Sequence, residues 1–146
     1  MIAGRFGDTT GRPYVSGRLL LPRVGLAANL SFLVDTGADC STLMPGDGIK
    51  MDLDYTDLQN PTAVGGMGGN AACYQEPAVV LFHEPNRKLM RAYSINLMIP
   101  RLDPDLFRMP SLLGRDVLDR WHMSYDPSRD KLSFTVRSAD HTIKTS

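Results

Sequence analysis

Alternating apolar and polar positions recur along the chain and predict a series of short β-strands. Residues 14–21 are rich in apolar side chains, and residues 30–34 place leucine, phenylalanine and valine on one face. The segment between them, Pro-Arg-Val-Gly at 22–25, has turn chemistry, so the two runs are predicted to form a hairpin. Residues 78–82 form a compact apolar run and residues 93–99 alternate, which predicts two further strands.

The last third of the chain predicts a short helix followed by a closing hairpin. Residues 111–120 begin as an apolar strand and are expected to continue as a helix from about Arg115. Trp121, Met123 and Tyr125 form an alternating stripe that is expected to be core, and alternation returns at 132–136 after a turn. The polar tail, 137–146, is expected to fray or to pair with a partner chain.

The number of strands decides the fold class. Strand-like runs follow one another at close spacing, and only the C-terminal helix is convincing, although Pro45 could open a single helical turn. This pattern predicts an all-β, barrel-like or sandwich architecture, because an alternating α/β sheet would need a helix between successive strands. A chain of 146 residues fits one domain, here 1–146, with a core of about residues 12–136.

Composition and charge exclude several classes of function. The chain carries 16 basic and 16 acidic residues, so nothing suggests attraction to nucleic acid or to an anionic membrane surface. No apolar run approaches the ~20 residues that span a bilayer, and the N-terminus lacks the apolar segment of a signal peptide, which predicts a cytoplasmic protein. The two cysteines, Cys40 and Cys73, lie 33 residues apart and are predicted to be free thiols. The three histidines are scattered singly, so no metal and no cofactor are expected.

The candidate chemistry lies in residues 32–39, Phe-Leu-Val-Asp-Thr-Gly-Ala-Asp. The apolar run is predicted to carry Asp35 into the interior at the end of a strand. A buried carboxylate is costly to desolvate, which favours a functional role for Asp35. The alternative is that Asp35 is an ordinary turn or helix-capping residue in an unrelated β protein.

Three motifs in order resemble the retropepsin-like aspartic proteases, most closely the small bacterial members. The first is residues 33–39, the second is the glycine-rich segment 65–69, and the third is Leu-Leu-Gly-Arg-Asp at 112–116. The resemblance covers roughly residues 12–136 and implies a closed acid-protease barrel with one short C-terminal helix. It also implies an endopeptidase that is active as a homodimer, because the chain has one Asp-Thr-Gly and the reaction uses two aspartates.

The resemblance also assigns roles to particular residues. Asp35, Thr36 and Gly37 correspond to the catalytic residues, and substrate would be bound by Gly37, Ala38, Asp39 and by a β-hairpin flap with Gly66, Met67 and Gly68. Structural support would come from Leu113, Gly114 and Arg115, with Arg115 paired to Asp39. Each assignment has an ordinary alternative: a flexible loop at 65–69, and a surface ion pair for Arg115 and Asp39.

Two rival functions fit the same motifs. The chain could be a non-catalytic peptide-binding or dimerisation module that keeps the fold, or a domain of a larger polyprotein that processes itself. For the endopeptidase, the expected partners are a second copy of the chain and a peptide or protein substrate.

Overall fold

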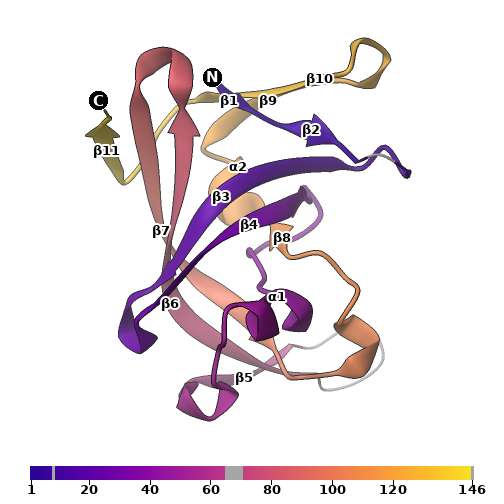
Figure 1. Cartoon of the computed structure of the whole chain (residues 1–146), viewed down its shortest axis with the longest axis vertical. Helices are drawn as coiled ribbons and strands as arrows, with labels where there is room; N and C mark the ends of the chain where they lie inside the picture. The colour runs from indigo at the N-terminus through magenta and orange to yellow at the C-terminus, as the bar shows by residue number, and fades with distance from the viewer. Residues whose placement is uncertain (8, 65–70, 146) are drawn as a thin grey trace.

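The protein is built almost entirely from β-strands (Figure 1). A computed structural model describes residues 1–7, 9–64 and 71–145. The strands are β1 (Ile2–Ala3), β2 (Arg5–Phe6), β3 (Pro13–Leu21), β4 (Leu26–Val34), β5 (Pro61–Val64), β6 (Ala71–Glu84), β7 (Leu89–Pro100), β8 (Leu112–Leu113), β9 (Trp121–Asp126), β10 (Lys131–Val136) and β11 (His141–Lys144). The two short α-helices are α1 (Pro45–Lys50) and α2 (Arg115–Leu118).

The strands form two sheets. A three-stranded sheet has the order β1-β10-β9, and a larger one runs β11-β7-β6-β3-β4-β8, with β2 added beside β3 and β5 beside β6. Figure 1 shows the long β6–β7 hairpin crossing the β3–β4 hairpin. The smaller sheet and α2 lie above this crossing in the view. The all-β class predicted from the sequence is confirmed. Among the described residues the strand order does not return to its start, so the pairing does not show the closed barrel that was expected.

The β3–β4 hairpin delivers the chain to the candidate site. Its strands pair from Leu21↔Leu26 to Tyr14↔Leu33, as the sequence predicts. Pro22 opens a single 3₁₀ turn between them, and Gly25 closes it in the left-handed region at φ +70°. The inward-facing side chains of both strands are buried, namely Val15, Leu19, Leu21, Leu30, Phe32 and Val34.

An aromatic cluster joins the two sheets. The rings of Phe82 and Trp121 meet edge to face at 4.8 Å, and Trp121 Nε1 donates to the hydroxyl of Tyr93 at 2.6 Å. Trp121 is therefore core, as predicted, but Tyr125 is 52% exposed and contacts Phe6 edge-on. The prediction of a fully buried stripe is wrong at Tyr125, which lies near the end of an edge strand of the three-stranded sheet.

The structure corrects two further expectations. A second helix, α1, begins at Pro45, where the sequence predicted at most one helical turn. The C-terminal tail pairs with its own chain, because β11 adds to the edge of β7 from His141↔Ala92 to Lys144↔Leu89. Asp140 fixes the start of this strand by accepting hydrogen bonds from Ser94 N and Arg120, and these bonds lower its pKa.

A buried ion pair beside the turn of the β6–β7 hairpin yields a stability prediction. Glu84 is 2% exposed and accepts from Arg91 Nε at 2.6 Å and from the amino group of Met1 at 3.0 Å. Burial alone would raise the pKa of Glu84, but these bonds outweigh it and hold the pKa below its ordinary value of 4.5. We expect Glu84→Gln to lower the free energy of unfolding by about 3 kcal/mol at pH 7, because Arg91 loses its buried counter-charge.

Urea denaturation across pH tests this prediction. Because the folded pKa is the lower one, the ionised carboxylate stabilises the protein above pH 4.5, and that contribution is lost as the pH falls through the folded pKa. The difference between wild type and Glu84→Gln should therefore shrink below pH 4.5. Arg129→Gln, in an exposed pair with Asp126 at 3.7 Å, is the control and should change stability by less than about 0.5 kcal/mol. Equal effects of the two substitutions would contradict the prediction.

Candidate functional site

Asp35 stands at the first position after β4, and a parallel neighbour strand fixes its backbone. Leu33 and Val34 pair with Leu112 and Leu113 of β8. The backbone N–H of Asp35 then donates to Leu113 O at 3.0 Å. The carboxylate is thus attached to a point of the sheet that is held from both sides, since β4 also pairs with β3.

The segment that follows, residues 35–40, turns back on its own side chain; we call it the Asp35 loop. Gly37 N donates to Asp35 Oδ1 at 2.9 Å, and Ala38 N donates to Asp35 O at 3.2 Å. A Cβ at Gly37 would lie 3.2 Å from the same Oδ1, so glycine leaves the carboxylate room. One carboxylate oxygen is therefore oriented by the backbone, and the structure gives Oδ2 no hydrogen bond within the described residues.

The predicted burial of Asp35 is wrong for the single chain. Val34 is buried, but Asp35 is only partly covered, and Thr36 and Gly37 are exposed. The strand pairing with β8 ends at Val34, which is also the last residue of the apolar run. The chain then leaves the sheet and turns toward the surface, which exposes part of Asp35. The desolvation cost that the sequence suggested is therefore not incurred by one copy of the chain alone.

Gly114 places a second backbone segment directly behind the Asp35 loop. A Cβ at Gly114 would lie 2.6 Å from the carbonyl carbon of Cys40 and 2.9 Å from Ala38 O, both of which are backbone atoms. The next residue, Arg115, donates its N–H to Ala38 O at 2.8 Å. Leu113, on the other side of Gly114, is fully buried. The structure thus brings together the first and third motifs of the sequence.

Arg115 and Asp39 form an ion pair, as the resemblance implies. Their side chains are 46% and 82% exposed in the single chain, so the pair is well solvated. Exposed pairs contribute little to stability, typically below about 1 kcal/mol. In one copy of the chain, the pair therefore orients Asp39 at the edge of the site rather than holding the fold together.

Two buried serines, which sequence reasoning missed, hold the segment that directly follows the Asp35 loop. Ser41 donates its N–H and its hydroxyl to the Asp116 carboxylate at 2.9 and 2.7 Å, and its Oγ accepts from Gly114 N at 3.0 Å. Ser111 accepts from Met44 N and donates to Asp47 at 2.6 Å. One signal for the first network is present in the sequence, Asp116 directly after Gly-Arg, but the second network has no local signal.

The predicted flap residues Gly66, Met67 and Gly68 lie outside the described residues. Their flanks are described and are strands, as expected: β5 and β6 pair antiparallel from Pro61↔Tyr74 to Val64↔Ala71. The glycine-rich segment therefore connects two paired strands, which is the place that the predicted flap requires.

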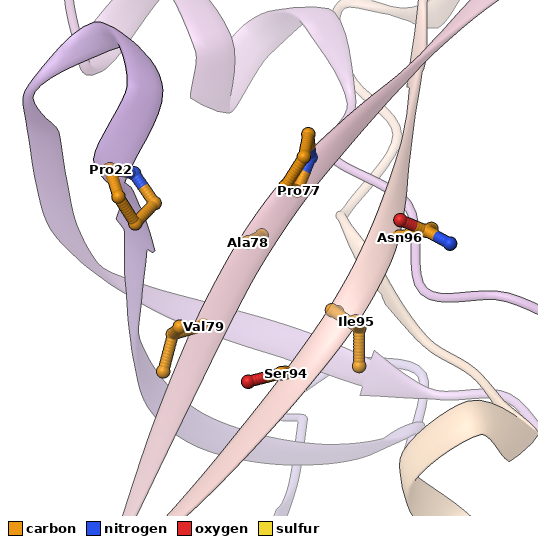
Figure 2. A pocket seen from close by; sticks show the side chains of 7 residues that line it. All are labelled: Pro22, Pro77, Ala78, Val79, Ser94, Ile95 and Asn96. Carbon is orange, nitrogen blue, oxygen red and sulfur yellow. The ribbon is translucent and has the colours of Figure 1, made fainter.

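Two pockets differ in their relation to the Asp35 loop. One of about 350 Å³ adjoins the loop and is lined by Asp39, Cys40, Thr42, Cys73, Met98 and Pro100; we call it the Cys40 pocket. The other, of about 310 Å³, lies over the β6–β7 hairpin beside the turn at Pro22 (Figure 2). Figure 2 shows Pro77 and Val79 along one strand and Ser94 and Asn96 along the other, with no titratable side chain among them. Of these two pockets, the Cys40 pocket is the one lined by titratable side chains.

Within the described residues, no three histidine, cysteine or acidic side chains lie close enough together to hold a metal ion. The helices of the described chain include none with the length and apolar content needed to cross a bilayer.

Comparison with solved structures identifies the fold. The chain is similar to a retropepsin-like aspartic protease from Rickettsia conorii, with 23% identity and a TM-score of 0.53, over 92% of this chain and 88% of that one. It also matches EIAV protease in complex with the inhibitor HBY-793, with 22% identity and a TM-score of 0.46, over 77% and 90% of the two chains. No protein-family model and no curated protein sequence matches the chain. At such identities the first likeness shows the fold alone, and the fold is retropepsin-like.

Proposed function

We propose that the chain is an aspartic endopeptidase that hydrolyses peptide bonds as a homodimer. The observation that carries this proposal is the placement of Asp35, which is only partly covered, on a loop anchored to β8 and backed by Gly114. Asp35, Thr36 and Gly37 of each copy would form the catalytic loops. The retropepsin-like fold supports a protease, since the Rickettsia protein of that fold is described as an aspartic protease.

The chemistry explains why a second copy is needed. Peptide hydrolysis by carboxyl groups requires one group to take a proton from water and another to protonate the leaving amine. Two neighbouring carboxyls do both, because repulsion between their charges keeps one of them protonated, as is documented for the aspartic-protease dyad. This chain supplies one such aspartate, and a two-fold axis beside the exposed Asp35 loop would supply the other.

The same geometry favours an extended peptide as the substrate. Gly37, Ala38 and Asp39, which are exposed or half-buried, would contact the substrate backbone, so that a peptide adds beside the Asp35 loop as a strand does. The predicted flap residues 66–68 would close over the peptide from the β5–β6 hairpin. The Cys40 pocket, which Met98 and Pro100 make largely apolar, would receive a substrate side chain.

The partial exposure of Asp35 is also compatible with a second candidate function, a peptide-binding module without catalysis. Because one copy does not bury the carboxylate, burial no longer argues against a peptide-binding module without catalysis. The two functions differ in one property: an enzyme consumes peptide, whereas a binding module only retains it. A self-processing domain would in addition cleave its own flanking sequence in a longer chain.

The deciding experiment measures cleavage of a diverse peptide library between pH 4 and pH 9 at several protein concentrations. We expect cleavage with a mildly acidic optimum, because the dyad works with one shared proton. We also expect total activity to rise faster than linearly with concentration, because only dimers carry a complete site. Binding without cleavage, at concentrations where sedimentation shows a dimer, would establish the non-catalytic module. Activity that climbs steadily to pH 9 would exclude the aspartate dyad.

A further inference from the structure

Four consecutive residues, 113–116, are hydrogen-bonded to the Asp35 loop or to Ser41, which directly follows it. Two of the bonds join backbone atoms and reach the start and the middle of the loop, namely Asp35 N to Leu113 O at 3.0 Å and Arg115 N to Ala38 O at 2.8 Å. Ser41 bonds to the other two residues, Gly114 and Asp116. The loop is therefore held at its start, its middle and its end by one segment of the chain.

The side chains of Ser41 and Asp116 make the connection at the end of the loop; we call them the Ser41–Asp116 network. The hydroxyl of Ser41 donates to Asp116 Oδ1 at 2.7 Å and accepts from Gly114 N at 3.0 Å, while Ser41 N donates to Asp116 Oδ2 at 2.9 Å. Ser41 is fully buried, so water does not replace a bond that is lost there. Asp116 Oδ1 also accepts from Val117 N at 3.0 Å, so both carboxylate oxygens are in use.

A second network of the same chemistry holds a different part of the chain. Ser111 is also fully buried, and its hydroxyl donates to Asp47 Oδ2 at 2.6 Å and accepts from Met44 N at 3.0 Å. Asp47 belongs to α1, and Met44 directly precedes that helix. The two networks thus match in burial, donor and acceptor, but only the Ser41–Asp116 network ends on the Asp35 loop. Ser111 and Asp47 therefore provide a matched control.

We propose that Ser41 and Asp116 are positioning residues, which fix the end of the Asp35 loop and thereby the direction of the Asp35 carboxylate. This inference rests on the proposed function. Two carboxyls that share a proton across a dimer axis must be held to within about 0.5 Å, and a misplacement of about 1 Å can cost about 100-fold in rate. The ion pair of Arg115 with Asp39 also joins the two segments, but it is well solvated. The buried side-chain bonds of the Ser41–Asp116 network are therefore the stronger constraint.

Steady-state kinetics of two alanine variants separates positioning from support of the fold. We expect Ser41→Ala to lower kcat about tenfold or more and to change KM by less than about twofold. KM is spared because Thr42, which lines the Cys40 pocket, keeps its own backbone bonds to Leu112 at 2.9 Å. Ser111→Ala should lower the urea midpoint as much as Ser41→Ala does but keep the wild-type kcat. All proteins are assayed folded, at concentrations where sedimentation shows dimers.

A milder pair of variants tests the network from its acidic side. Both oxygens of Asp116 accept hydrogen bonds, whereas an asparagine offers one acceptor and an NH₂ group that would face another donor. Within the described residues, Asp47 accepts a side-chain bond through Oδ2 alone, so an asparagine there can still accept from Ser111. We expect Asp116→Asn to lower kcat about tenfold and Asp47→Asn to change it by less than about twofold.

Amide hydrogen exchange, followed by NMR, reports the position of the loop without any cleavage assay. The N–H groups of Ala38 and Arg115 report its middle, because they donate to Asp35 O and to Ala38 O. We expect both to exchange about tenfold faster or more in Ser41→Ala, and within about twofold of wild type in Ser111→Ala.

The outcomes distinguish this inference from the function on which it rests. Equal responses of Ser41→Ala and Ser111→Ala, in kcat or in exchange, would overturn the proposal. Faster exchange in Ser41→Ala with an unchanged kcat would overturn it as well, because the loop would then move without consequence for the reaction. A wild type without any cleavage would instead refute the proposed function, and the exchange rates would still decide whether Ser41 fixes the Asp35 loop.

Discussion

If the proposed function holds, replacement of Asp35 by asparagine is expected to lower kcat/KM for peptide cleavage by about 10³-fold or more, since the proposed dimer would then lack the carboxyls that take and return the proton. Stability should change little, because Asp35 is only partly covered and an asparagine oxygen can still accept from Gly37 N. Steady-state kinetics with a peptide from the library screen, beside urea denaturation of both proteins, measures the two effects. A variant that cleaves normally would remove Asp35 from the mechanism.

Mixing the variant with the wild type tests whether two chains share one site. At a concentration where sedimentation shows that nearly all chains are dimeric and copies exchange freely, an equal amount of Asp35→Asn captures about half of the wild-type chains in mixed dimers. Each mixed dimer carries one aspartate, so the activity of a fixed amount of wild type should fall to about half, and to about a quarter with a threefold excess. An activity that does not respond to the added variant would show that each chain works alone.

The sequence predicted the site where local pattern and tertiary structure agree. The alternation at 30–34 gave the strand that delivers Asp35, and the apolar pair at 112–113 gave the strand beside it. The ion pair between Asp39 and Arg115, 76 residues apart, was implied by the family resemblance of the two motifs. Each of these features depends on a side-chain period or on a motif, and both are legible in one dimension.

Other features depend on what lies opposite in space, and the sequence does not display that. The exposure of Asp35 is decided by where the pairing with β8 stops, and that strand is nearly eighty residues away. The polar tail reads as a fraying end, yet it forms β11 because β7 offers an edge and Ser94 and Arg120 hold Asp140. Cys40 and Cys73 likewise line one pocket because β7 pairs with β6 on one side and with Thr42 on the other.

Gly114→Ala is expected to lower the free energy of unfolding by about 2–3 kcal/mol and to abolish most of the cleavage activity. The backbone of Gly114 has φ −98°, which any residue adopts, so the requirement for glycine is one of space. An added methyl group would approach the carbonyl carbon of Cys40 to 2.6 Å, and a backbone atom cannot rotate away as a side chain does. Overpacking of this kind typically costs 1–3 kcal/mol.

The relief of that clash should be visible in function, because the atoms that must move belong to the Asp35 loop. Ala38 and Cys40 lie on one side of the contact, so displacement of either one shifts the segment proposed to bind the peptide. Gly25→Ala is the control: it adds a methyl group in open space at φ +70°, far from the site, and should cost about 1 kcal/mol without loss of specific activity. Thermal denaturation and kcat/KM, both at a temperature where all three proteins are folded, separate the cases. If Gly114→Ala loses stability but keeps normal kcat/KM, the segment behind the loop supports the fold and does not position the site.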